Sequence, residues 1–195
     1  MIEVIDNALP EWLFQRLKHV VQYQMPYWVG TITPEPDPFI GMGEEIDHNN
    51  QFGELFFNSF LSFRERFNAT GLLRCKVGII PRDIRYTIHA PHIDRCSEHY
   101  VGLLYLNNTD GDTYIYKNKF DFEYRKNYNK EYNNEEYQVV FDWKKENNLT
   151  NDDFEVEQAV TPKENRLVVF DGAHFHSSST PTKTQMRWAI NYNFI

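Results

Sequence analysis

Apolar residues at the start of the chain follow the alternating spacing of a strand and then the spacing of a helix. Residues 2–5 predict a short strand, and Asp6 or Asn7 is expected to cap the helix that follows, which has Pro10 and Glu11 in its first turn. The apolar stripe of this helix consists of Leu13, Leu17, Val20 and Val21. The stripe gives the helix one face that can pack against a core.

A loop and a second helix follow. Residues 31–50 read TITPEPDPFIGMGEEIDHNN, and their many Pro, Gly and acidic residues predict a loop, which is a candidate lid. A helix is expected from about residue 51 to 67, and Gly71 is expected to end it. Its apolar side consists of Phe52, Leu55, Phe56, Phe60 and Phe63.

Beyond Gly71 the pattern changes to short apolar segments between turn residues, which is typical of a strand-rich domain. These segments are LLRCKVGII, HYVGLLYLNN, TYIY, NRLVVFDG and RWAINYNF. Residues 117–151, rich in Asn, Tyr, Lys and Glu, show no clear period and are predicted to be a long insertion with a short helix around residues 137–145. So long a connection in a compact domain usually serves binding or is disordered, and we expect it to cover a functional site together with residues 31–50.

Composition narrows the class of protein. The 195 residues are 41% hydrophobic and 16% aromatic, which predicts a single β-rich domain. The change of pattern near Gly71 divides this domain into a helical support (residues 1–70) and a strand core (residues 71–195). No apolar run approaches the roughly 18 residues that cross a bilayer. The first residues also lack the pattern of an export signal. We therefore expect a soluble, cytoplasmic protein without a membrane partner.

The cysteines and the net charge exclude further classes. Cys75 and Cys96 are the only cysteines, so this chain alone cannot build a disulfide framework or a four-thiolate zinc site. A reducing compartment is expected. The formal charge of −8 argues against a large basic surface, so nucleic acid is not an expected partner.

The first candidate for chemistry is the segment Ala90-Pro91-His92-Ile93-Asp94. An imidazole and a carboxylate two residues apart share one face of extended backbone and can chelate one metal ion. A His-x-Asp triplet is common by chance, however, and becomes specific only with a third ligand.

The third ligand is sought in NRLVVFDGAHFHSSSTP, where a turn is followed by His174 and His176. Two histidines and one carboxylate form the facial triad of non-haem Fe(II) oxygenases, although spacing alone does not choose between these two histidines. In the final segment, polar residues from Arg187 to Asn193 alternate with apolar ones. Such a polar face would meet water on a surface strand, or would line a barrel that encloses a charged co-substrate.

On these motifs the chain resembles the prolyl-hydroxylase-type branch of the 2-oxoglutarate and iron dependent oxygenase superfamily, from about residue 4 to residue 194. The late block VVFDGAHFHSSSTPTKTQMRWAINYNF resembles the final strands of that family. The resemblance implies a mainly β fold with flanking helices, in which a double-stranded β-helix (a jelly-roll, cupin-like core) packs on N-terminal helices. Tailed bacteriophages encode similar proteins, which implies a short phage-type form in the host cytoplasm.

Carried over to this sequence, the family pattern makes His92, Asp94 and His176 the metal ligands, and His174 becomes a neighbour that remains the alternative to His176. The resemblance implies that Arg187 pairs with the distal carboxylate of 2-oxoglutarate, a task that suits a planar guanidinium.

Other positions match the family less fully. Tyr105 occupies the place from which prolyl hydroxylases bind the same carboxylate, and residues 111–113 resemble the family's GGxT turn with Asp as the second residue. Ala189 stands where relatives often have a serine that adds a hydrogen bond to the co-substrate. Asn193, Tyr86 or water is expected to replace that bond.

The resemblance implies a dioxygenase that uses Fe(II), 2-oxoglutarate and O2, supported by ascorbate, and releases succinate and CO2. Retention of Asp94 favours hydroxylation, because halogenating relatives replace this carboxylate with a small residue. The implied substrate is a prolyl or other peptidyl residue, a free amino acid or another small molecule. Three alternatives remain: an oxygenase that modifies nucleic-acid bases, a non-catalytic metal-binding β-helix module, and a zinc hydrolase.

Overall fold

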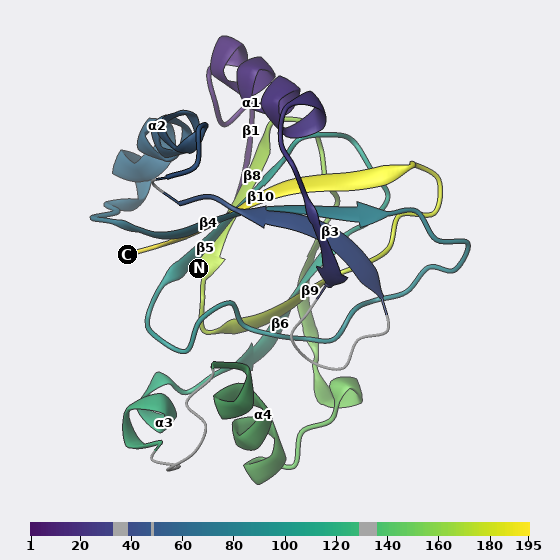
Figure 1. The fold of residues 1–195 in the computed structure, drawn as a ribbon. Coiled ribbons are helices and arrows are strands. Elements are labelled where there is room, and N and C mark those ends of the chain that lie inside the picture. Colours follow the sequence, from purple (N-terminus) through teal and green to yellow (C-terminus); the bar gives the residue numbers. More distant parts are fainter. Residues whose placement is uncertain (33–38, 48, 129–135) are drawn as a thin grey trace.

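Two antiparallel sheets face each other across the centre of the molecule (Figure 1). The computed structural model describes residues 1–32, 39–47, 49–128 and 136–195. The large sheet has the strand order β1-β8-β5-β10-β4-β3-β2, and the small sheet has the order β7-β6-β9. In chain order the strands are β1 (Ile2–Asp6), β2 (Trp28–Thr31), β3 (Ile40–Glu45), β4 (Leu72–Pro81), β5 (Tyr100–Tyr105), β6 (Thr113–Lys119), β7 (Val156–Val160), β8 (Arg166–Asp171), β9 (His174–Ser178) and β10 (Met186–Phe194).

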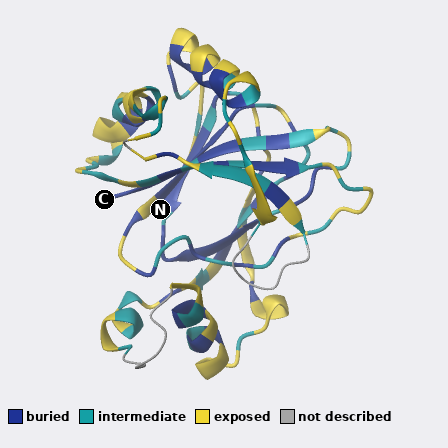
Figure 2. Cartoon of the chain, viewed as in Figure 1, coloured by how far each residue is buried: buried dark blue, intermediate teal, exposed yellow. Residues whose placement is uncertain are grey.

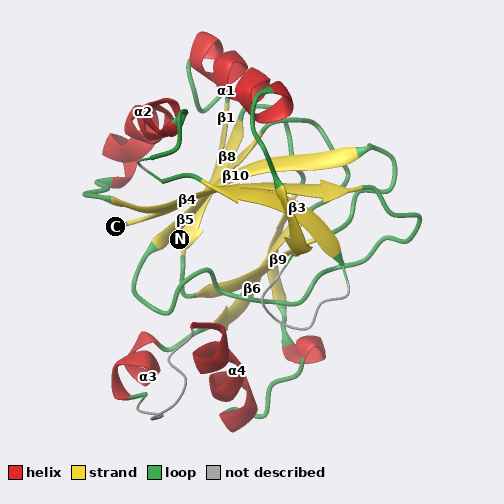
Figure 3. Ribbon diagram, viewed as in Figure 1, coloured by secondary structure: helices red, strands yellow, loops and turns green. Residues whose placement is uncertain are grey.

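The helices lie outside the two sheets (Figure 3). Helices α1 and α2 lie beside the large sheet, and α3 and α4 lie beyond the small sheet. No helix in the described segments has both the length and the apolar composition to span a bilayer. The helices are α1 (Glu11–Tyr23), α2 (Gly53–Arg64), α3 (Phe122–Asn127) and α4 (Glu136–Glu146), with 3-10 turns at Glu65–Phe67 and Asn151–Asp153.

The outer face of the large sheet forms the main core together with α1 and α2. On β10, Ile190, Tyr192 and Phe194 point toward the helices, while the residues between them point into the molecule. The buried helix residues of this core include Leu13, Leu17, Val20, Val21, Phe56, Phe60 and Phe63 (Figure 2). The predicted apolar stripes of both helices, and the alternation predicted for the last strand, are confirmed.

The residue predicted to cap the first helix and the residue predicted to stop the second are wrong. Helix α1 begins directly after Pro10 without a side-chain cap, because Asp6 instead accepts a hydrogen bond from Arg166 at 2.6 Å. The 3-10 turn that continues α2 ends at Asn68, whose φ of 52° stops the helix before Gly71.

The loop predicted over residues 31–50 contains a strand. Strand β3 pairs with β2 on one side and with β4 on the other, so this segment extends the large sheet. Its positions on the inner face include Gly41 and Gly43, which hide the apolar alternation that identifies a strand. Residues 33–38 and 48 of the segment lie outside the described residues.

The helix predicted in the insertion is confirmed as α4, whereas residues 117–119 belong to β6. Val139 and Val140 pack with Ile93 and Phe175 in a second core on the outer side of the small sheet. This part of the insertion therefore supports the fold from behind. Residues 129–135 lie outside the described residues.

Candidate metal and co-substrate site

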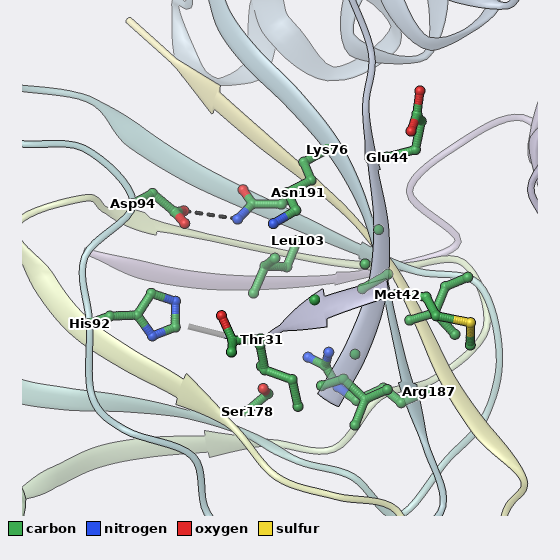
Figure 4. A pocket seen from close by; sticks show the side chains of 18 of the residues that line it. Thr31, Met42, Glu44, Lys76, His92, Asp94, Leu103, Ser178, Arg187 and Asn191 are labelled. Atoms are coloured by element: carbon green, nitrogen blue, oxygen red, sulfur yellow. Dashed lines mark hydrogen bonds between the residues drawn. The ribbon is translucent and has the colours of Figure 1, made fainter. Parts of the chain in front are cut away.

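A cavity of about 330 Å³ lies between the two sheets (Figure 4). Strands β4 and β10 contribute its wall on the large sheet, and β6 and β9 contribute residues from the small sheet. The hairpin formed by β2 and β3 lines its rim. Of the sequence-predicted site residues, His92, Asp94, His176 and Arg187 all line this one cavity.

His92, Asp94 and His176 form a cluster that fits a metal ion. One ligand atom from each lies within 4.8 Å of the others, and Nε2 of His176 lies 3.8 Å from Oδ2 of Asp94. The two imidazole rings are 4.5 Å apart between centroids. Three donors that converge from one side leave the other side of an ion open to ligands.

Main-chain pairing holds the cluster together. The amide of His92 donates to the carbonyl of His176 at 3.0 Å, and the amide of His176 donates to the carbonyl of His92 at 2.9 Å. The carbonyl of Pro91 accepts a hydrogen bond from the buried Lys144 ammonium of α4 at 2.6 Å. Helix α4 of the insertion therefore supports the His-x-Asp segment, and the described residues of the insertion do not line the cavity.

Two asparagines that sequence reasoning did not link to the metal orient Asp94. Asn191 and Asn193 each donate an amide hydrogen to its Oδ2, at 2.9 and 2.8 Å. Arg74 adds a longer charge contact of 3.7 Å to Oδ1. The alternation of β10 is the sequence signal that places both asparagines on the inner face, but it does not show which side chain they meet.

The protonation states of the cluster suit metal binding. Burial, together with the neighbouring His176, lowers the pKa of His92 to about 3, and burial also lowers the pKa of His176. Burial opposes ionisation of Asp94, but the interactions with His176, His92, Arg74 and the amide of Asn191 outweigh burial and hold the pKa below its usual range. Neutral imidazoles and an ionised carboxylate are the forms that bind a metal ion.

His174 lies outside this cluster although it is two residues from His176 on β9. Its Nδ1 lies 2.7 Å from the carbonyl oxygen of Tyr116 and 3.5 Å from a carboxylate oxygen of Glu157. Among the described residues, the group whose donor atoms converge contains His176 and not His174. The geometry therefore favours His176 as the third ligand.

Arg187 is 5% exposed and is fixed by the turn before β6. Its Nε donates to the carbonyl of Gly111 at 2.9 Å, and one terminal nitrogen donates to Oγ1 of Thr113 at 2.7 Å. A Cβ at position 111 would lie 2.8 Å from the carbonyl oxygen of Ser179 and 3.1 Å from Cδ of Arg187. Glycine is therefore needed at position 111 of this turn.

The other residues predicted to contact the co-substrate are not part of the cavity lining. Tyr105 is fully buried, donates to Thr113 at 2.8 Å and lies with its ring 5.4 Å from the Arg187 guanidinium carbon, so it positions Arg187 and does not line the cavity. Tyr86 is 47% exposed, and its hydroxyl meets that of Tyr114 away from the cavity residues. Asn193 is engaged by Asp94, as described above.

Comparison with protein families gives one match. The model of a family described as "Family of unknown function (DUF6445)" matches residues 56–189, a span that contains His92, Asp94, His176 and Arg187. No curated protein matches the sequence.

Solved structures resemble the whole chain. An oxidoreductase of the 2OG-Fe(II) oxygenase family from Burkholderia pseudomallei has a TM-score of 0.65 at 13% identity, over 99% of this chain and 84% of that protein. A Trichoplax adhaerens prolyl hydroxylase, solved with a peptide fragment of the oxygen degradation domain of hypoxia inducible factor, has a TM-score of 0.57 at 15% identity, over 100% and 83%. HygX from Streptomyces hygroscopicus, with nickel and 2-oxoglutarate bound, has a TM-score of 0.59 at 10% identity, over 99% and 82%. These likenesses confirm the double-stranded β-helix core expected from the sequence.

Proposed function

We propose that this chain, which belongs to the DUF6445 family of unknown function, is an Fe(II)- and 2-oxoglutarate-dependent dioxygenase that hydroxylates a C–H bond. The observation that carries the proposal is that a metal-binding triad and a buried arginine line the same cavity. A metal-binding module alone would have no use for Arg187, and a zinc hydrolase would give it no task.

The spacing along β10 supports a dicarboxylate between these two features. Arg187 and Asn191 are four residues apart on the inner face, or roughly 13 Å at 3.3 Å per residue. Asn191 contacts Asp94, so the backbone position beside the metal-binding triad and the backbone position of Arg187 are separated by about this distance. A five-carbon dicarboxylate that binds the metal at one end and a guanidinium at the other fits such a span.

Each residue then has a defined task. His92, Asp94 and His176 would hold Fe(II) and leave positions open for the keto acid end of 2-oxoglutarate and for O2. Arg187 would hold the distal carboxylate through charged hydrogen bonds. The bound iron supplies the oxidation chemistry, which converts 2-oxoglutarate to succinate and CO2 and hydroxylates the substrate. Ascorbate is expected to support turnover by keeping the iron reduced.

Thr113 supplies the hydrogen bond that Ala189 lacks. Its Oγ1 accepts hydrogen bonds from both Tyr105 and Arg187, so its own hydroxyl hydrogen is available to another acceptor. Thr113 and Ala189 both line the cavity. A carboxylate bound to Arg187 would therefore lie close to the Thr113 hydroxyl, which is a further hydrogen-bond donor.

The proposed substrate is a prolyl or other peptidyl residue, or an amino acid. The fold shared with prolyl hydroxylases supports the peptidyl option, and the modest volume of the cavity supports a small molecule. Base modification in nucleic acids is disfavoured by the net charge of −8. A phage origin and a place in the host cytoplasm remain predictions from the resemblance.

Formation of succinate tests the proposed function. Purified protein with Fe(II), ascorbate, O2 and 2-oxoglutarate should form succinate slowly alone and faster with a true substrate, whose mass should rise by one oxygen atom. His92→Ala should form none, while Lys117→Met, an exposed change on β6, should match the wild type. Failure of the wild type to bind 2-oxoglutarate in the presence of metal would remove the proposal.

A further inference from the structure

The cavity has a second cationic side chain that the proposed function does not use. Lys76 of β4 lines the cavity and is partly buried. Within the described parts of the chain, no hydrogen bond or ion pair engages its ammonium group. By contrast, the nearby Arg74 contacts Glu45 at 3.5 Å and Asp94 at 3.7 Å.

Strand register separates Lys76 from the place of the 2-oxoglutarate carboxylate. Lys76 pairs with Asn191, whereas Arg187 pairs with Ile80 at the other end of the same two strands. Since four residues of extended strand span roughly 13 Å, the Lys76 backbone lies level with the asparagine that holds Asp94 and far from Arg187. Figure 4 shows Lys76 beside Asn191, with Arg187 at the opposite side of the cavity.

Charge balance leaves Lys76 in excess once the co-substrate binds. Two positive charges of Fe(II) and one each from Arg187 and Arg74 are offset by Asp94, Glu45 and the dianion of 2-oxoglutarate. Glu44 also lines the cavity, but strand alternation places its side chain with that of Met42 on the face of β3 opposite to Gly43 and Glu45 (Figure 4). One positive charge remains in the cavity, on Lys76.

Four glycines form the sheet beside Lys76, and the Ile32 side chain covers one of them, Gly41. Gly43 and Gly78 are cross-strand partners on β3 and β4, and Gly30 and Gly41 are partners on β2 and β3. A Cβ at Gly43 would lie 3.2 Å from Cε of Lys76, so the absence of a side chain at Gly43 leaves space for the Lys76 side chain. A Cβ at Gly78 or Gly30 would meet nothing within 4 Å, so packing does not require glycine there and the space above them is open.

We propose that Lys76 binds the carboxylate of the primary substrate, and that this substrate is a small carboxylic acid, such as a free amino acid, whose body lies over the glycines beside it. The inference rests on the proposed function, because it places the substrate next to the metal. An ammonium that none of the described residues hydrogen-bonds gains most from an anion that enters with the substrate. A residue inside a polypeptide has no carboxylate of its own main chain to offer.

Binding of acetate tests this inference, with acetamide as the neutral probe of the same shape. The protein is loaded with Mn(II) and excess 2-oxoglutarate without O2, and the paramagnetic relaxation of the probe's methyl protons is followed in a titration. Acetate should show saturable relaxation and acetamide should not. Lys76→Met should raise the acetate dissociation constant roughly tenfold or more, while Lys76→Arg should largely preserve it.

The controls separate this inference from the proposed function. Lys117→Met removes an exposed lysine and should bind acetate as the wild type does. Unchanged acetate binding in Lys76→Met, equal relaxation of acetamide, or no saturable acetate binding in the wild type would overturn the inference. Weakened Mn(II) binding in Lys76→Met would also overturn the inference, because Lys76 would then support the metal ligand Asp94 and not the substrate. Relaxation of the 2-oxoglutarate protons in the same samples reports on the proposed function independently.

A comparison of turnover addresses the competing substrate class. If free amino acids stimulate succinate formation more than their carboxamides do, and Lys76→Met removes that difference, the inference is supported. If peptides with blocked termini stimulate turnover and free amino acids do not, a peptidyl residue is the substrate and the inference is overturned.

Discussion

At the scale of single residues, the candidate metal site depends on which side chains contact Asp94. The His-x-Asp triplet could be found in the sequence because alternation alone places His92 and Asp94 on one face. The choice between His174 and His176 could not be made from the sequence, because they lie two positions apart on one strand and alternation places both on the same face. The roles of Asn191 and Asn193 could not be predicted either, because asparagines on an alternating strand are also typical of a solvent-exposed face.

The geometry predicts different results for the two histidines of β9. His176→Ala should remove a donor from the converging group and lower Mn(II) affinity by at least about tenfold, a lower bound for loss of a metal ligand. His174→Ala should leave Mn(II) affinity close to that of the wild type. Titration of Mn(II) followed by electron paramagnetic resonance measures both. Loss of metal in His174→Ala with retention in His176→Ala would reverse the assignment.

Arg187 should affect the co-substrate and not the metal. Arg187→Ala removes charged hydrogen bonds from a buried site, a loss of about 1.5–3 kcal/mol, so the 2-oxoglutarate dissociation constant should rise roughly tenfold to a hundredfold. Arg187→Lys should recover only part of it, because an ammonium lacks the planar fork. Calorimetric titration of the Mn(II)-loaded protein gives these constants. Equal 2-oxoglutarate affinity in all three proteins would exclude this role for Arg187.

At the scale of elements, the connection before β10 is held by one carboxylate. Asp110 accepts hydrogen bonds from the backbone amides of Thr182, Lys183 and Thr184, and also from the hydroxyls of both threonines. Burial opposes its ionisation, but these hydrogen bonds outweigh burial and hold the pKa of Asp110 below its usual range. This carboxylate fixes the segment from which Arg187 enters the cavity.

The lowered pKa of Asp110 gives a pH dependence of stability with a defined sign. Because the folded pKa is below the unfolded value of about 3.9, the stabilisation is present above that pH and is lost as the pH falls. Asp110→Asn should therefore lower the free energy of unfolding by roughly 1–2 kcal/mol at pH 7 and by less at pH 3. Urea unfolding at the two pH values measures it. A difference between the proteins that is larger at pH 3 would contradict this account.

The two segments expected to cover the site have different positions. The β2–β3 hairpin lines the cavity, whereas α4 packs behind the small sheet. Binding of metal and 2-oxoglutarate should therefore slow amide exchange in Trp28–Thr31 and Ile40–Glu45 and leave Glu136–Glu146 nearly unchanged. Hydrogen exchange with mass spectrometry resolves these segments, with Arg187→Ala as the control. Protection of α4 without protection of the hairpin would contradict the positions described here.

At the scale of the whole molecule, the site joins the two sheets. His176 comes from the small sheet. The asparagines that orient Asp94, and Arg187, which we propose binds 2-oxoglutarate, come from β10 of the large sheet. The fold class could be predicted because the hydrophobic period changes from helical to alternating near Gly71. The hairpin β2–β3 could not, because its inner positions are glycines and its pairing depends on main-chain hydrogen bonds to β4.

The proposed function is tested most directly by a crystal structure of the protein with Mn(II) and 2-oxoglutarate, with diffraction recorded on both sides of the manganese absorption edge. We expect one anomalous peak within bonding distance of His92, Asp94 and His176. We also expect 2-oxoglutarate to bind this ion at its keto acid end and Arg187 at its distal carboxylate. Manganese bound elsewhere, or a 2-oxoglutarate that does not reach Arg187, would contradict the proposed function.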